Sequence, residues 1–175
     1  MAMQEGYPFI LVMHEQGGSY YLSQGTYLYR FKSTKSHLTY LVRAEEYLEH
    51  AYCIKFYNKN HQHSDDKYSL LTNTFEVRTI LYTIYHILLD VLKRDPKASF
   101  FFIGASDGHD VAGEATRRFG VYRVFTSSVV SEDFFEHFRF KEMSLYILVN
   151  KESVVDRHEY AERLKAEVSR AYSEE

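Results

Sequence analysis

The stretch "ASFFFIGAS" (98–106) is a continuous apolar run of strand length. Such a run is typical of a strand that is buried on both faces near the centre of a sheet. Segments with helical character precede and follow it. The stretch therefore predicts a central strand between two helices that pack on the sheet.

The segment before it, 73–95, predicts the clearest helix. Its apolar residues recur at the i, i+3, i+4, i+7 spacing of one helix face: Val77, Ile80, Leu81, Ile84, Leu88, Val91 and Leu92. Asn73 with Glu76 resembles a capping box at the start. At the end, "KRDP" (93–96) places cations at the negative pole of the helix dipole and then a proline.

The segment after it, 111–127, predicts a second helix. Ala115, Phe119, Tyr122 and Thr126 form an apolar line that we expect to pack on the sheet. The connecting loop holds "DGHD" (107–110), in which Asp107-Gly108 suits a turn and Asp110 suits a helix cap.

The remaining segments complete an α+β fold. Runs at 9–15, 26–33, 37–50 and 51–58 predict an antiparallel meander, although 37–50 also fits a short helix. A polar loop follows at 59–67. Runs at 135–140 and 143–150 predict a hairpin around Lys141 and Glu142, and 153–175 an amphipathic helix started by Ser153 or Asp156, with Tyr160, Leu164 and Val168 as its apolar line. We expect one domain, 1–175, with helices on an antiparallel-to-mixed sheet in the order β-meander, α, β, α, ββ, α.

Composition narrows the class of protein. The net charge of −3 disfavours a generic nucleic-acid coat. A single cysteine, Cys53, excludes an internal disulfide and lies in an apolar run, which indicates a buried, inert thiol. No leader and no apolar stretch of membrane-spanning length is seen, so we expect a protein of the bacterial cytoplasm. The 16 tyrosines and 13 phenylalanines suggest a partly exposed sheet face or an interface, and hence a homodimer.

Two resemblances follow from these segments. "SLLTNTFEVRTILYTIYHILLDVLKRDPKASFFFIGAS" and "TRRFGVYR" resemble an uncharacterised bacterial family that has a "TN" helix start, a "P.A" turn, a Gly-Ser strand end and "RTRLYR". That family carries no activity to transfer. The chain departs from its pattern in a longer loop after Gly104 and in the glycine within "RRFGVYR".

The order of elements is similar to the core of GNAT acyltransferases. In that family the first helix starts with a Gly-rich turn whose amides hold the acyl-coenzyme pyrophosphate. Here the corresponding place reads "LLTNTFEVRTIL", which holds no glycine. The resemblance therefore implies a related fold but leaves the cofactor without its usual loop.

The strongest candidate site lies where strand 98–106 meets helix 111–127. Free amides at the helix start favour an anion or substrate, and Asp107, His109 and Asp110 are types that also bind metals. The structural alternative is a turn and a cap. "HQHSDD" (61–66) holds further metal-ligand types, but its composition indicates a solvated loop. We expect no metal and no cofactor.

The candidate ligand-binding residues at this junction are Ser106, His109, Arg117, Arg118, Tyr122 and Arg123. Since each residue turns a helix by about 100°, the three arginines diverge and at most two can share one anion. One interpretation is an anion clamp, or with Tyr122 a nucleotide-stacking surface. The structural alternative pairs an arginine with Glu114 or Glu76.

No catalytic residue can be assigned. Cys53 has no visible His partner, Ser106 lies outside a G-x-S-x-G context, and His86 suits a buried helix edge. The leading hypothesis is a binding or interaction module for a small anion or a protein partner. The alternatives are a divergent acyltransferase-like or nuclease-like enzyme and a single-stranded nucleic-acid binder.

Overall fold

The computed structural model describes residues 6–16, 25–48, 50–61, 76–104 and 115–173. These residues form a mixed α+β fold in the predicted order, with short 3-10 turns at Lys59–His61 and Lys141–Met143. The strands are β1 (Phe9–Gln16), β2 (Gly25–Lys32), β3 (Thr39–Glu46), β4 (Ala51–Asn58), β5 (Ser99–Ile103), β6 (Phe135–Phe140) and β7 (Leu145–Asn150); the helices are α1 (Val77–Arg94), α2 (Arg117–Val129) and α3 (Arg157–Ser173).

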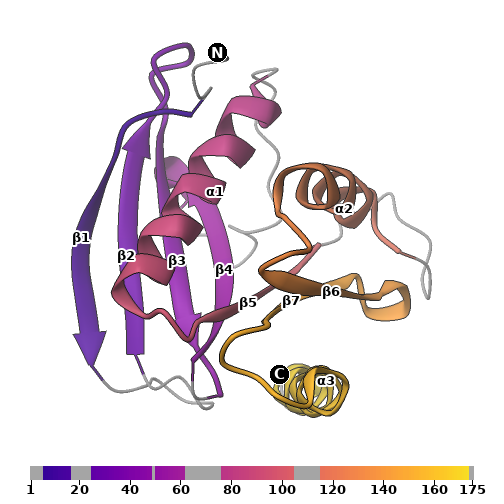
Figure 1. Ribbon diagram of the computed structural model, residues 1–175. Coiled ribbons are helices and arrows are strands. Elements are labelled where there is room, and N and C mark those ends of the chain that lie inside the picture. The colour runs from indigo at the N-terminus through magenta and orange to yellow at the C-terminus, as the bar shows by residue number, and fades with distance from the viewer. Residues whose placement is uncertain (1–5, 17–24, 49, 62–75, 105–114, 174–175) are drawn as a thin grey trace.

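The seven strands in the described part of the chain join one sheet in the order β1-β2-β3-β4-β5-β7-β6. The first four form the predicted meander, so 37–50 contributes a strand rather than a helix. Of the pairs in this sheet, β4–β5 is parallel and the others are antiparallel. The chain therefore crosses over the sheet through α1 between β4 and β5 (Figure 1).

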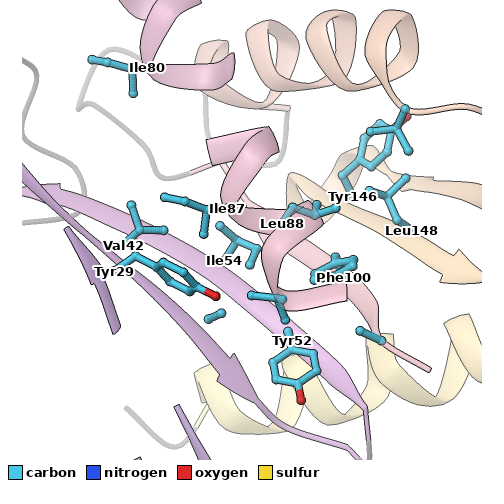
Figure 2. Packing of buried hydrophobic residues seen from close by; sticks show 14 of the residues in the cluster. Tyr29, Val42, Tyr52, Ile54, Ile80, Ile87, Leu88, Phe100, Tyr146 and Leu148 are labelled. Atoms are coloured by element: carbon cyan, nitrogen blue, oxygen red, sulfur yellow. The ribbon is translucent and has the colours of Figure 1, made fainter. Parts of the chain in front are cut away.

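The helices cover both faces of the sheet. Helix α1 lies over the meander, while α2 and α3 lie on opposite sides of β5, β7 and β6 (Figure 1). Strand β5 confirms its predicted burial on both faces, because Phe100 packs into the core with α1 and Phe101 into the core with α3. Figure 2 shows Leu88 of α1 close to Ile54 of β4 and Phe100 of β5.

The start of α1 differs from its predicted start. The helix begins at Val77, and Glu76 at its N-cap position makes no side-chain cap hydrogen bond. Asn73 lies outside the described residues. Val77 is 51% exposed, whereas Ile87, which the predicted stripe omitted, is fully buried. The buried stripe of α1 therefore includes Ile87, which lies beside Val42 of β3 in the meander (Figure 2), and it leaves out Val77.

The start of α2 also differs. Ala115 and Thr116 are not helical, and the helix begins at Arg117. The Thr116 hydroxyl accepts a hydrogen bond from the Phe119 N–H at 3.1 Å, so Thr116 is the cap. Asp110 lies outside the described residues. Of the expected packing line, Phe119 and Thr126 are buried, but Ala115 is exposed because it precedes the helix.

The C-terminal segments follow the prediction closely. Strands β6 and β7 form the hairpin around Lys141 and Glu142. Asp156 caps α3 by accepting the Glu159 N–H at 3.1 Å, while the Ser153 hydroxyl instead bonds the Lys97 carbonyl at 2.9 Å. Leu164 and Val168 are buried and Tyr160 packs against them.

The tyrosines in the described part of the chain do not collect on an exposed sheet face. Many of those described are buried in the cores because their rings stack with other aromatic rings, as Tyr146 does on Phe102 at 5.1 Å. Their hydroxyls reach partners at the core edge, as Tyr29 does with Asp90 at 2.6 Å. The aromatic excess therefore builds the interior. Among the described residues, no helix has the length and apolar character needed to cross a membrane.

Candidate functional site

The parallel strands β4 and β5 separate partway along their length. They pair only from Ala51 to Cys53 against Ser99 to Phe101, and the rest of β4 has no described partner strand on that side. Helices α1 and α2 flank the place where the strands part (Figure 1). A cavity of about 430 Å³ opens there. Cavities of this size are typical of sites for small molecules.

The cavity wall takes one face from each helix. Leu81, Ile84, Tyr85 and Leu88 follow the i, i+3, i+4, i+7 spacing on α1, and Arg118, Tyr122, Phe125 and Thr126 follow the i, i+4, i+7, i+8 spacing on α2. The strands and the end of α2 supply Cys53, Ile54, Lys55, Phe56, Phe100, Phe102, Ile103, Val130 and Leu148. The wall is therefore mainly apolar, and none of these lining residues is acidic.

Tyr122 stands at the centre of the opening between the strands. Its ring lies 6.2 Å from that of Phe56 on β4 and 5.6 Å from that of Phe102 on β5. Burial raises the pKa of the Tyr122 hydroxyl, and the nearby charge of Arg118 opposes this shift. Tyr122 therefore keeps its proton near neutral pH and offers a hydrogen-bond donor beside a guanidinium.

The position of α2 is set by its first turn. The Thr116 hydroxyl donates to the Gly104 carbonyl at 2.8 Å, and the Thr116 N–H donates to the Ser144 hydroxyl at 2.9 Å. The Gly104 N–H in turn donates to the Ser144 carbonyl at 2.9 Å. A Cβ on Gly104 would lie 2.5 Å from the Phe119 nitrogen, so only glycine allows this close approach. These contacts hold the first turns of α2, which carry Arg118 and Tyr122, against the end of β5.

The structure separates the predicted arginines. Arg118 lines the cavity with Tyr122, while Arg117 is exposed and Arg123 is half-buried outside the wall. Ser106 and His109 lie outside the described residues, as do Asp107 and Glu114. Glu76, the other acid considered as an arginine partner, is buried and accepts instead from the Ser36 hydroxyl at 3.3 Å.

Two side chains of β4, Lys55 and Cys53, also line the cavity, and their surroundings set their charge or protonation. The Lys55 ammonium, which also lines the cavity, lies 2.9 Å from a Glu45 carboxylate oxygen. The predicted burial of Cys53 is confirmed, and this burial raises the pKa of its thiol to about 12. Arg118 and Tyr122 are further polar groups of the wall, and a guanidinium beside a hydroxyl suits an anion.

Most of the residues that line the cavity cannot be identified from the sequence, for a physical reason. Ile84, Leu88 and Phe100 have the same pattern as core residues, and periodicity does not distinguish a wall from a core. The early divergence of β4 and β5 depends on pairing between segments that are distant in the chain. Comparisons of this chain with protein families, with curated proteins and with solved structures found no match.

Proposed function

We propose that this protein binds a small molecule that has an apolar body and one anionic group, in the bacterial cytoplasm. The observation that carries the proposal is the cavity between β4 and β5, whose apolar wall includes Arg118 and Tyr122. Ligand sites in proteins share this composition, with many apolar side chains and a few polar groups that orient the ligand.

The chemistry of the two polar groups selects the ligand class. A guanidinium binds carboxylate or phosphate through two parallel N–H donors, and the Tyr122 hydroxyl adds a third donor. The apolar wall from α1 and β5 removes the hydrocarbon body from water, which stabilises the complex by about 25 cal/mol for each Å² buried. The ligand therefore places its anion at α2 and its body between the strands.

Calorimetric titration with octanoate, 2-naphthoate and hexyl phosphate tests this proposal. We expect binding of at least one of these anions, and at least tenfold weaker binding of octanamide, which lacks the charge. Arg118→Met weakens binding of the anion about tenfold and leaves octanamide unaffected, since tenfold corresponds to about 1.4 kcal/mol.

Arg117→Met is the matched control, because this exposed neighbour does not line the cavity. It leaves binding unchanged. Leu88→Trp fills the cavity and abolishes binding of every probe. The proposal is wrong if none of the three anions binds at millimolar concentration, or if Arg117→Met weakens binding as much as Arg118→Met.

A second proposal is acyl transfer, with the bound molecule an acyl thioester. It is supported by the order of the elements, which is similar to the GNAT core, and by Tyr122 in the cavity wall. When an amine of the acceptor attacks the thioester carbonyl and loses a proton to water, the Tyr122 hydroxyl can donate a proton to the thiolate that leaves. Thermal-shift measurements with coenzyme A and acetyl-coenzyme A test it. The proposal is supported if these ligands raise the melting temperature of the parent protein and of Tyr122→Phe equally, while the variant loses turnover of acetyl-coenzyme A. It is overturned if millimolar coenzyme A does not change the melting temperature.

A further inference from the structure

A second group of polar side chains lies at the other end of β4, where β4 and β5 are still paired. Glu46 ends β3, His50 lies in the turn before β4, and Asp95 follows α1. Each offers one ligand atom, and these atoms all lie within 4.8 Å of one another. The three side chains are half-buried. Three separate elements therefore direct an imidazole and two carboxylates to one point.

The backbone around this group is well held. The His50 carbonyl accepts the Ser99 N–H of β5 at 2.8 Å, which ties the turn to the sheet. The Asp95 N–H donates to the Val91 carbonyl at 2.8 Å and closes the last turn of α1. The ligand atoms are thus carried by fixed backbone, as a binding site requires.

Asp95 is oriented by its neighbours. One of its oxygens lies 2.6 Å from His50 Nδ1 and accepts the Tyr52 hydroxyl at 2.8 Å, and the other accepts the Lys97 N–H at 3.2 Å. A hydrogen-bonding partner behind a carboxylate ligand is a recurring feature of metal sites because it fixes the orientation of the ligand. Tyr52 supplies that partner here.

Glu46 distinguishes this group from an ordinary His–Asp pair. Its carboxylate lies beside the pair but makes no hydrogen bond or ion pair to a described residue. Two carboxylates this close repel each other when both are ionised, and a cation between them removes the repulsion. A cation bound between Glu46 and Asp95 is therefore attracted by both carboxylates.

We propose that Glu46, His50 and Asp95 bind a first-row divalent transition-metal ion such as Zn²⁺ or Mn²⁺. Imidazole nitrogen and carboxylate oxygen together suit these ions, whereas Mg²⁺ and Ca²⁺ prefer oxygen ligands alone. Three protein ligands leave at least one position for water or a substrate. The site does not depend on the cavity between β4 and β5, from which it is separated by the paired part of the two strands.

Calorimetric titration of the EDTA-treated, full-length protein with ZnCl₂ and MnCl₂ tests the proposal. We expect one ion of at least one of these metals per chain, and a rise in melting temperature. Glu46→Gln and His50→Gln each weaken binding at least tenfold, and Co²⁺ gives visible d–d absorption without a thiolate charge-transfer band.

Two control variants make the outcome decisive. Glu45→Gln removes the adjacent carboxylate, which is paired with Lys55, and leaves binding unchanged. The double variant His61→Gln, His63→Gln removes the imidazoles of the polar loop and also leaves it unchanged. The proposal is overturned if neither metal binds, if the loop variant abolishes binding, or if Glu46→Gln binds as tightly as the parent protein.

Discussion

Replacing Gly104 with alanine tests how closely α2 packs on β5. The added Cβ would lie 2.5 Å from the Phe119 nitrogen and 2.7 Å from both the Phe119 Cα and the Thr116 hydroxyl oxygen. The nearest two obstacles are backbone atoms, so α2 itself must move. Overpacking of this kind lowers the free energy of unfolding by about 1–3 kcal/mol. Because alanine restricts the unfolded chain more than glycine does, the substitution also stabilises the fold by about 0.5 kcal/mol, which offsets part of this loss.

We therefore expect Gly104→Ala to lower the free energy of unfolding by about 2 kcal/mol. With a urea dependence of about 2 kcal/mol per molar, the midpoint of urea unfolding falls by about 1 M. The displacement of α2 also carries Arg118 and Tyr122 away from the cavity. Octanoate or whichever probe the parent protein binds is therefore bound at least tenfold more weakly by the variant under native conditions.

Gly120→Ala is the matched control on the same helix. A Cβ there meets nothing within 4 Å, and glycine inside a helix is less favourable than alanine. This variant should raise the free energy of unfolding by about 0.5–1 kcal/mol and leave probe binding intact. The packing argument fails if Gly104→Ala unfolds at the same urea concentration as the parent protein, or if the two variants change stability in the same direction.

Three further substitutions or conditions have defined outcomes. Asn150→Ala should lower the free energy of unfolding by about 3 kcal/mol in urea titrations, because the buried Asn150 amide donates to the Pro96 and Ala98 carbonyls at 3.0 and 3.1 Å; a loss below about 1 kcal/mol would contradict this. Tyr29→Phe removes the hydroxyl donor to Asp90 and should cost about 1.5 kcal/mol, measured in the same way; an unchanged midpoint would show that the bond adds nothing. Native Cys53 should resist a thiol reagent at pH 8 and react on unfolding. Because the pKa of this thiol is raised from 9.0 to about 12 in the folded protein, its contribution to stability is complete below pH 9.0 and is lost as the pH rises toward about 12. Between pH 8 and pH 10 the free energy of unfolding of the parent protein should therefore fall by about 1 kcal/mol more than that of Cys53→Ala.

The candidate site was predictable only in part. The junction of β5 with α2 and two of its residues, Arg118 and Tyr122, follow from a strand feeding a helix in the sequence. The cavity-lining residues of α1 and β4 could not be predicted, because the pattern of apolar residues is the same whether they face a core or a cavity. The sequence did not predict the group formed by Glu46, His50 and Asp95 for another reason. Asp95 is 45 residues from His50 in the chain, and only the sheet brings the two together.

The sequence by itself determined the order of the elements and the burial of β5, since hydrophobic periodicity is a local property of the chain. It also determined the buried face of α3, since Leu164 and Val168 of the predicted apolar line lie in the core. Only the tertiary structure decided where β4 and β5 part, how α1 turns, and that α2 begins at Arg117. These features depend on long-range strand pairing and on the contact between Gly104 and Phe119, which no local pattern encodes.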